Sequence, residues 1–504
     1  MAVHISRRDF LRISGLGGTL AALAACSPPQ SKELLETIAT AVPTAAPKLD
    51  PKGFILHTLR RFSFGPTETE LDAAFAVGLE SWLEEQLAAD ASDAPDVESR
   101  LAEFETLKMS PGELRDLQEN GRVARELGAS SIVRQIFSPY QLYEVMVDFW
   151  TNHFNIYAYS PPELFLKGKD DREVIRAHAL GSFPEMLAAS AHSPAMLVYL
   201  DNAQSRQPSP NENYARELLE LHTLGVDGGY TYADIQAVAR AFTGWSVERL
   251  RRGANQAGDF AYLTNWHDPE PKIALGQELP GKKGDGDRVL EILAEHPSTA
   301  RFIATKLSQR FVSDTPPDSL ISRVADTYEQ TSGDIPAMLR TIVTSDEFAA
   351  SAGLKLKRPL DFVVSAIRVT GADGRLDRVL RFFLQVLGQV PFGWPAPDGY
   401  PDYASAWTNT NQSLYRWNLA LMVTSGLLPG ISTELSSRFG GYSSTTDLVD
   451  SLSLALMGAQ LPTDARHILI EFGQSIQDAN LPIEIDPPSL LAGLILSTPH
   501  FQIR

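Results

Sequence analysis

From residue 54 onward, apolar side chains recur every three or four positions along most of the chain. This spacing is typical of helices that bury one face and expose the other. Thr67, with Glu70 three residues later, predicts a capping box at the start of a helix that runs to Leu83. The same spacing predicts helices over residues 140–152, 183–191, 212–224, 232–243, 287–294, 299–311, 320–331, 335–344, 359–369, 376–387, 414–424 and 447–457. The fold is therefore expected to be mainly α.

One segment has a different pattern. Between residues 259 and 279, apolar side chains alternate with polar ones around a turn that contains proline, at Phe260, Tyr262, Ile273 and Leu275. Alternation with a period of two predicts strands, here paired as a small β-hairpin. No fixed-period repeat is visible. We therefore expect one large helical domain over residues 52–504, or two subdomains within it, with a small β-hairpin insertion.

The first 25 residues have the layout of an export signal. Arg7 and Arg8 precede Phe10, and an apolar stretch of 11 residues follows at positions 13–23. The arginine pair resembles a twin-arginine signal, and Leu-Ala-Ala before Cys26 resembles a lipobox. The stretch is too short to span a bilayer, which needs about 20 residues. Residues 1–25 are thus interpreted as a twin-arginine lipoprotein signal peptide, with Cys26 as the lipidation site.

Two alternatives stay open for this end. The signal could remain as an uncleaved anchor helix, or it could be cut beside a cysteine that carries no lipid. Residues 26–51 are rich in Pro, Ala, Ser and Thr, which indicates a flexible tether. The predicted location is outside the cytoplasm, as a periplasmic or cell-surface protein held at the inner or outer membrane through its N-terminal lipid.

Composition narrows the classes of partner. The net charge of the chain is −18, and removal of residues 1–25, which carry three arginines and one aspartate, would leave −20. Such an acidic chain is a poor ligand for nucleic acid or for anionic lipid. Cys26 is the single cysteine, so no internal disulfide can form. Hydrophobic residues make up 43% of the chain, enough for a large core.

Several segments together form a specific pattern. The longest reads Asn-Glu-Asn-Tyr-Ala-Arg-Glu-Leu-Leu-Glu-Leu-His at 211–222, and others lie at 148–154, 176–181, 200–202, 225–231, 241–245, 267–269, 392–395 and 397–401. Over residues 54–425 the chain strongly resembles a bacterial family called domain of unknown function 1800. The family pattern reads Trp-His-Asn-His-Phe and Arg-Pro-His, where this chain has Thr151 and Ala177. The resemblance implies an exported protein, often encoded beside a sulfatase-like exported family, and it supplies no activity.

The segment at 212–224 places polar groups together. At about 100° per residue, Asn213, Arg216, Glu217 and Glu220 share one quadrant of the predicted helix, opposite His222. Glu217 or Glu220 could act as general acid or base, while Arg216 holds an anionic group. The alternative is a solvated face with an Arg216–Glu220 ion pair.

Other polar and aromatic groups complete the candidate site. Two carboxylates on adjacent turns lie on one side of a substrate, so a third must face them, and the candidates are Asp148, Asp201 and Asp268. The segment 392–407 mixes aromatic rings with acids on a proline-rich loop, notably Trp394, Asp398 and Tyr400. Such a loop suits sugar or peptide binding, and it equally suits covering a core.

The family-like segments also contain His153, His178, His222 and His267. Imidazole and carboxylate ligands together suit zinc, iron or manganese, so a divalent metal is one hypothesis. No His-Glu-x-x-His motif is present, and a single histidine on an apolar face is more often a core residue.

These observations give two expectations of function. The first is a hydrolase-like enzyme with a carboxylate-centred site, acting on glycan or sulfated envelope or extracellular material. The second is a non-catalytic binding or assembly partner of a co-exported sulfatase-like protein. A second carboxylate facing the Glu217 side of the helix would favour the enzyme, and a flat exposed face would favour the partner.

Overall fold

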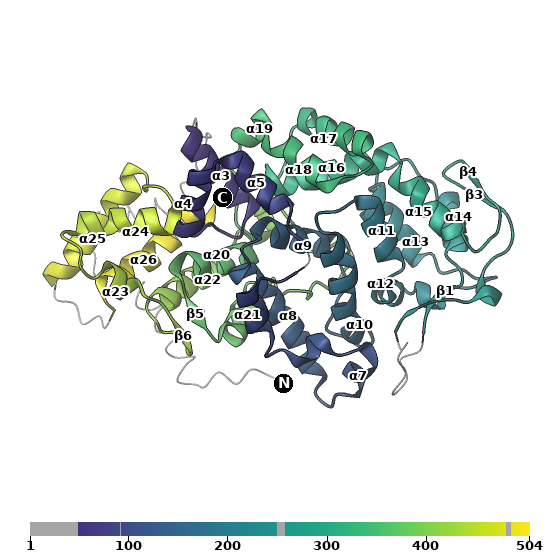
Figure 1. Cartoon of the computed structure of the whole chain (residues 1–504), viewed down its shortest axis with the longest axis horizontal. Coiled ribbons are helices and arrows are strands. Elements are labelled where there is room, and N and C mark those ends of the chain that lie inside the picture. Colours follow the sequence, from purple (N-terminus) through teal and green to yellow (C-terminus); the bar gives the residue numbers. More distant parts are fainter. Residues whose placement is uncertain (1–48, 91, 249–257, 480–484) are drawn as a thin grey trace. The chain divides into compact units, whose positions relative to one another are not determined.

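The computed structural model describes residues 49–90, 92–248, 258–479 and 485–504 (Figure 1). The predicted signal peptide, most of the predicted tether and Cys26 lie outside these residues. The described chain forms two compact units. Unit 2 contains residues 80–349 and 390–402, and unit 1 contains the described residues up to 79, residues 350–389 and residues 403–504. Each unit therefore includes segments that are far apart in the sequence.

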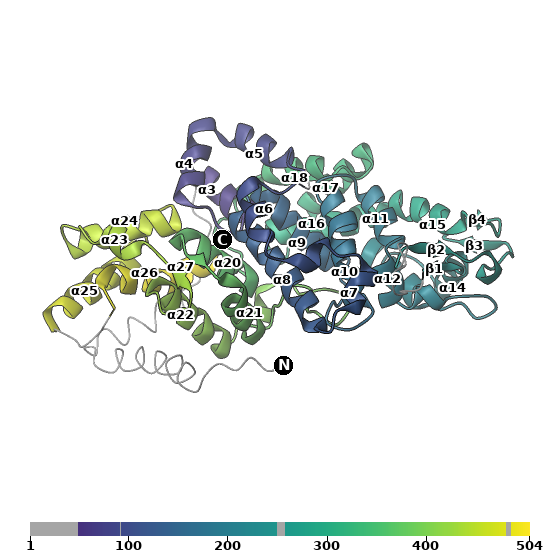
Figure 2. The same ribbon diagram turned by 60° about the horizontal axis from the view of Figure 1, so that its bottom comes forward.

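Unit 2 is built mainly from helices. Thr231 caps one of them, because its hydroxyl accepts the backbone N–H of Asp234 while the Asp234 carboxylate accepts the backbone N–H of Thr231. The α-helices are α5 (Leu79–Leu87), α6 (Pro95–Leu101), α7 (Pro111–Asp116), α8 (Asn120–Phe137), α9 (Gln141–His153), α10 (Glu163–Asp170), α11 (Phe183–Ala191), α12 (Pro194–Tyr199), α13 (Asn213–Glu217), α14 (Tyr232–Ala241), α15 (Asp285–Ala294), α16 (Pro297–Phe311), α17 (Asp318–Thr331), α18 (Ile335–Val343) and α19 (Asp346–Ala349). Both views place α16, α17 and α18 side by side (Figures 1 and 2).

Several short helical turns connect these elements. The 3-10 turns are η1 (Glu105–Lys108), η3 (Asn202–Gln204) and η5 (Thr264–Trp266). The segments η2 (Asp171–Arg176) and η4 (Leu218–Thr223) are π-helices, in which backbone bonds join residues five apart. Because π-helices are rare and often lie at functional sites, η4 is of interest: it continues α13, which carries the predicted carboxylates.

The strands of unit 2 form two separate pairs. β1 (Trp245–Val247) pairs with β2 (Phe260–Tyr262), and β3 (Lys272–Ala274) pairs with β4 (Gln277–Leu279), both antiparallel. The prediction that Phe260 and Tyr262 form a hairpin with Ile273 is therefore wrong. The turn of the β3–β4 hairpin is formed by Leu275 and Gly276, both with positive φ, a conformation that suits a two-residue turn.

Unit 1 is also helical. Its helices are α3 (Pro51–Phe62), α4 (Glu68–Val77), α20 (Pro359–Thr370), α21 (Leu376–Val386), η6 (Ala404–Trp407), α22 (Thr410–Thr424), α23 (Leu435–Phe439), α24 (Thr445–Met457), α25 (Thr463–Ala479), α26 (Pro487–Ser497) and α27 (Pro499–Gln502). β5 (Asp373–Gly374) pairs with β6 (Ile431–Ser432). A Cβ at Gly493 would lie 2.7 Å from Leu421, so glycine lets α26 approach α22 closely. Helices α24, α25 and α26 lie together (Figure 1).

The prediction of a mainly α fold is confirmed. The capping box at Thr67 is present, but the helix that it starts ends at Gly78, where φ is +83°, and α5 follows as a separate helix. Helices α3, α8, α10, α12 and α25 were not predicted from the sequence. Within the described ranges, no helix combines the length and apolar character needed to cross a membrane.

Candidate functional site

The predicted carboxylate helix begins as α13 and continues as the π-helix η4, so it is not one regular α-helix. Tyr214, Ala215, Leu218, Leu219 and His222 are buried. Glu217 and Glu220 are partly buried, while Asn213 and Arg216 are exposed. Arg216 forms its ion pair with Glu212, at 3.6 Å, so the predicted Arg216–Glu220 pair is wrong. Glu217 and Glu220 thus carry no ion pair within the described residues.

The segment 390–402 packs against α9 and α12 of unit 2. The carboxamide oxygen of Asn152 accepts the backbone N–H of Tyr400 at 3.2 Å. Asn155 Nδ2 donates to the backbone oxygens of Trp394 and Ala396 at 3.0 and 2.6 Å. A Cβ at Gly399 would lie 2.1 Å from the Asn152 carbonyl oxygen, so only glycine permits this approach. The loop is therefore held by Asn152, in the family-like motif of α9, and by Asn155, just after that motif.

Trp394 and Asp398 form the polar face of this loop. The indole Nε1 of Trp394 donates to Asp398 Oδ1 at 2.7 Å, and the Trp394 and Tyr400 rings lie 5.0 Å apart. The Tyr400 hydroxyl donates to the Val390 carbonyl at 2.8 Å, which closes the loop on itself. Asp398 itself is exposed, so its second carboxylate oxygen is open to a ligand.

Acidic groups from separate segments influence one another here. Burial raises the pKa of Glu217, and the negative charges of Glu220 and Asp398 raise it further, although Arg216 opposes them. Burial raises the pKa of Glu163, and Asp201 adds to this rise. We call Glu163, Glu217, Glu220 and Asp398 the acidic cluster. It unites α10, α13, η4 and the loop 390–402.

Tyr199 belongs to the same neighbourhood. Its hydroxyl donates to the Pro395 carbonyl at 2.8 Å. Burial raises the pKa of Tyr199 to about 12, and the charges of Asp398, Glu217 and Glu163 contribute to the rise. Three members of the acidic cluster therefore lie near this one phenol.

Helix α16 supplies the positive charges. Burial lowers the pKa of Lys306 to about 8, while Asp402 and Asp398 act in the opposite direction. Arg310, one turn further along, is buried, and its guanidinium nitrogens lie 3.9 Å from carboxylate oxygens of both Asp148 and Asp402. Arg310 thus joins the end of the loop to α9, and Lys306 interacts electrostatically with Asp402 and Asp398.

Two of the predicted metal ligands come together, and they are neutral. His153 and His222 are both buried, with ring centroids 6.1 Å apart, and His153 Nε2 donates to the His222 carbonyl at 3.0 Å. That carbonyl lies in the last turn of η4, where backbone oxygens lack helical partners. Burial lowers the pKa of His222 to about 3 and holds the pKa of His153 well below 6.5, and Lys306 adds to both effects.

The other two histidines lie elsewhere. His178 Nδ1 bonds the Val174 carbonyl at 2.8 Å, and His267 Nδ1 bonds the Thr243 carbonyl at 2.9 Å. The structure therefore does not assemble the four histidines into one metal site. Among the residues it describes, no three His, Cys, Asp or Glu side chains are arranged to hold a metal ion.

The three predicted partner acids, Asp148, Asp201 and Asp268, lie in different environments. Asp268 forms an ion pair with Arg240 at 2.7 Å, which gives it a local structural role. Asp201 is exposed, at a left-handed backbone position with φ of 62°. Asp148 is buried beside Asn152 and Arg310. Besides Glu220, the acid whose charge raises the pKa of Glu217 is Asp398, which the sequence suggested only as a binding residue.

Sequence reasoning missed several members of this site. They are Glu163, Tyr199, Lys306 and Arg310, and none of them belongs to a recognisable motif. The available signal in α16 is weak: Lys306 and Arg310 are four residues apart, and each is followed by an apolar residue, Leu307 or Phe311. That spacing places the two cations on the same side of the helix.

Fold and site together define a mainly helical protein whose unit 2 holds carboxylates, aromatic rings and two cations around one loop. The sequence model of a family described as protein of unknown function (DUF1800) matches residues 57–503, and the chain belongs to this family. Comparison with curated proteins and with solved structures gives no significant match.

Proposed function

We propose that this chain is an exported, lipid-anchored envelope protein and a hydrolase-like enzyme whose reaction takes place at the acidic cluster. The supporting observation is the environment of Glu217, a partly buried carboxyl whose pKa is raised by burial and by two other acids. A carboxyl group of this kind keeps its proton closer to neutral pH and can act as a general acid.

The proposed reaction is hydrolysis of a glycosidic bond. Glu217 donates its proton to the leaving oxygen as the bond from that oxygen to the anomeric carbon breaks. A water molecule attacks that carbon, and its proton passes to Asp398, whose Oδ2 is not engaged by Trp394. Glu217 and Asp398 come from different segments, α13 and the loop, so a substrate can bind between them as two-carboxylate hydrolysis requires.

The surroundings favour an uncharged glycan over a sulfated one. Four acids and the exposed face of Trp394 border the site, and aromatic rings with carboxylates bind sugar hydroxyls and C–H faces. A sulfate group would meet the negative field of the acidic cluster, in which Lys306 is a partly buried cation that interacts with Asp398.

The second candidate is a non-catalytic role as a partner of a co-exported sulfatase-like protein. The observation that favours it is the exposure of Asn213 and Arg216 on the outer side of α13. Polar, solvent-accessible side chains are typical of the rim of a protein interface. This role needs no proton transfer by Glu217.

The two candidates predict different behaviour of paired variants. Glu217→Gln and Asp398→Asn should each lower hydrolysis of neutral envelope polysaccharide by about 10²–10⁴-fold. Glu212→Gln, one turn away on the same segment, is the matched control and should retain activity within about threefold. Melting temperatures of all three should stay near that of the parent chain.

The assay is release of reducing ends from fractionated envelope and extracellular polysaccharides, with sulfated and unsulfated fractions kept apart. Absence of reducing ends from every fraction, together with co-purification of a sulfatase-like protein that is lost in Arg216→Ala, would favour the partner role. Equal activity of Glu217→Gln and the parent would refute the catalytic proposal.

The proposed location is tested separately. The support is the twin-arginine and lipobox pattern around Cys26, which lies outside the described residues. Cys26→Ser should move the mature protein from the detergent phase to the aqueous phase in detergent partition. A mature protein that stays in the detergent phase after this change would show that the lipid on Cys26 is not its anchor.

A further inference from the structure

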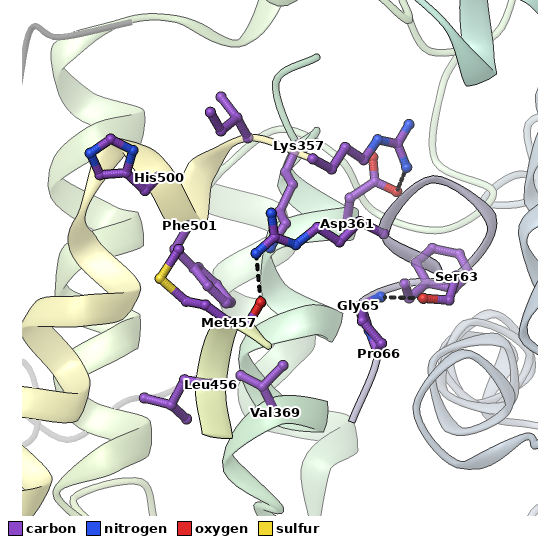
Figure 3. Close-up of a pocket in the computed structure, with 14 residues that line it drawn as sticks. Ser63, Gly65, Pro66, Lys357, Asp361, Val369, Leu456, Met457, His500 and Phe501 are labelled. Carbon is purple, nitrogen blue, oxygen red and sulfur yellow. Dashed lines mark hydrogen bonds and ion pairs between the residues drawn. The ribbon is translucent and has the colours of Figure 1, made fainter. Parts of the chain in front are cut away.

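Unit 1 contains a small recess that the proposed function does not use (Figure 3). Its wall is formed by the end of α3, the loop 63–66, α20 and the ends of α24 and α27. In Figure 3, Met457 and Phe501 lie on one side, and Gly65 and Pro66 lie on the other. The cavity volume is about 20 Å³. One water molecule needs roughly 10–15 Å³, so the recess admits a group of only a few atoms.

Two cations border the recess without an acid as a direct partner. The guanidinium of Arg60 donates to the Met457 carbonyl through Nη2. The Lys357 ammonium donates to Ser365 Oγ at 3.0 Å and lies 3.6 Å from the centre of the Phe501 ring. Neither Arg60 nor Lys357 has a carboxylate oxygen within 4 Å in the described part of the chain. We call the space between them the cationic recess.

The one acidic side chain at the recess is already paired. Asp361 lies 3.1 Å from Arg358 Nε and 3.6 Å from Arg504 Nη1, so two guanidiniums share its charge. Lys357 is 8% exposed and Arg504 is 2% exposed, so water screens these charges poorly. The side-chain charges around the cationic recess therefore carry an excess of positive charge.

The surroundings of the recess lower the pKa values of Arg60 and Lys357, so they disfavour the charged forms of these side chains. Burial lowers the pKa of Arg60 to about 10. Burial also holds the pKa of Lys357 well below 10.5, and Arg60, Arg504 and Arg416 lower it further, while Asp361 opposes them. Buried cations that repel one another destabilise a fold unless an anion lies between them.

We propose that the cationic recess binds a small oxyanion: free phosphate or sulfate, or the carboxylate or phosphate end of a larger ligand that remains outside. Arg60 presents N–H donors not used by Met457, and Lys357 presents further N–H donors beside the Ser365 hydroxyl. The edge of the recess reaches solvent, since Arg60, Pro66 and His500 are partly exposed. A larger ligand can thus enter by one end.

The test is isothermal titration calorimetry of the full-length protein in detergent with sodium phosphate, sodium sulfate and sodium acetate, at ionic strength fixed by sodium chloride. At least one of the three should bind saturably, with a Kd in the millimolar range or below. Arg60→Gln and Lys357→Met should each weaken this binding at least tenfold. Arg466→Gln, which removes one charge of the ion pair with Asp450 in the same unit, should leave the Kd within about twofold.

The three anions also separate the possible sources. Preference for phosphate and sulfate over acetate points to a tetrahedral group, and preference for acetate points to a carboxylate. The proposal is overturned if none of the three binds saturably, or if Arg60→Gln binds as the parent does. Lys357→Met keeps the length and apolar stem of the buried side chain, so this variant should fold. If it does not fold, the Kd of Arg60→Gln decides the test.

Discussion

The acidic cluster of unit 2 and the cationic recess of unit 1 are opposite arrangements within one chain. In unit 2, Glu163, Glu217 and Glu220 lie near a loop that carries a fourth acid, Asp398, and α16 contributes the cations Lys306 and Arg310. In unit 1, Arg60, Lys357 and Arg504 surround a space in which Asp361 is the single acidic side chain. The net charge of −18 reveals neither arrangement. Local charge, and not the total, therefore decides what each unit can bind.

Each of these two sites has a majority of charges of one sign and a minority of the other, and the two kinds of charge affect stability differently. A minority charge neutralises several neighbours of opposite sign, so the fold depends on it. A majority charge is repelled by its neighbours and is desolvated, so the fold is no less stable without it. Arg310 and Asp361 are minority charges, whereas Glu217 and Lys357 are majority charges. Removing each kind should have opposite effects on stability.

The largest effect is expected from the minority cation of unit 2. Arg310→Met should lower the free energy of unfolding by about 3–5 kcal/mol, because Asp148 and Asp402 lose a buried counter-ion. Urea unfolding measures this change. The matched control Arg288→Met removes an exposed pair with Glu291 and should cost less than about 1 kcal/mol. Equal losses of stability in Arg310→Met and Arg288→Met would show that a minority charge stabilises the fold no more than a cation in an exposed ion pair does.

The minority acid of unit 1 should give the next largest effect. Asp361→Asn should lower the free energy of unfolding by about 2–3 kcal/mol, because an amide still accepts a hydrogen bond from Arg358 but carries no charge. The control Asp450→Asn disrupts the partly exposed pair with Arg466 and should cost less than about 1 kcal/mol. Added phosphate should restore part of the lost stability in Asp361→Asn but none in Asp450→Asn. If phosphate restores no stability in Asp361→Asn, the charge of Asp361 does not act on the cationic recess.

Much of the helical fold could be predicted from the sequence, because apolar spacing and capping residues are local. Thr67 with Glu70 forms the predicted capping box, and Thr231 with Asp234 forms another. The pairing of the strands in this region could not be predicted, because strands of three residues carry little pattern and their partners are chosen by tertiary contacts. The change from α13 to the π-helix η4 has no signature in the apolar spacing either.

In the candidate site, too, local sequence patterns predict some features and tertiary contacts set the others. Glu217, Glu220 and Asp398 lie in dense motifs, so the sequence could point to them. Their mutual influence depends on the loop 390–402 returning to α9, about 240 residues later in the chain, and no local pattern encodes that return. Lys306 and Arg310 were missed because charged residues on an amphipathic helix are usually solvent-exposed.

The buried histidines beside the acidic cluster give a pH-dependent prediction. The unfolded chain protonates His222 near pH 6.5, but the folded chain does so only near pH 3, so acid favours unfolding between these values. His222→Phe removes this contribution, and its free energy of unfolding should exceed that of the parent by about 2 kcal/mol more at pH 5 than at pH 7. Chemical denaturation at the two pH values measures the difference.

The control for this prediction is Phe154→Leu, because the Phe154 ring packs 5.1 Å from the His222 ring. It loosens the same packing without removing a titrating group, so its loss of stability should be equal at pH 5 and pH 7. If His222→Phe shows no dependence on pH, the ring of His222 is not held neutral by its surroundings.

The smallest expected effect on stability belongs to Glu217, and its sign distinguishes a functional acid from a structural one. The pKa of Glu217 is raised above 4.5 in the folded chain, so the folded form binds a proton more readily than the unfolded form. Its contribution to stability is therefore full below pH 4.5 and is lost as the pH rises through the folded pKa. Glu217→Gln should match the parent at pH 4 and equal or exceed it at pH 7, by no more than about 0.5 kcal/mol.

Thermal melting at the two pH values measures this difference, with Glu212→Gln as the control that breaks an ion pair with Arg216. A Glu217→Gln protein that is less stable than the parent at pH 7 would mean that the charge of Glu217 supports the fold, as Arg310 does. A carboxyl group that adds nothing to stability at neutral pH, yet is desolvated beside two other acids, is instead retained for what it binds or protonates. The melting curves thus test the premise of the catalytic proposal before any substrate is known.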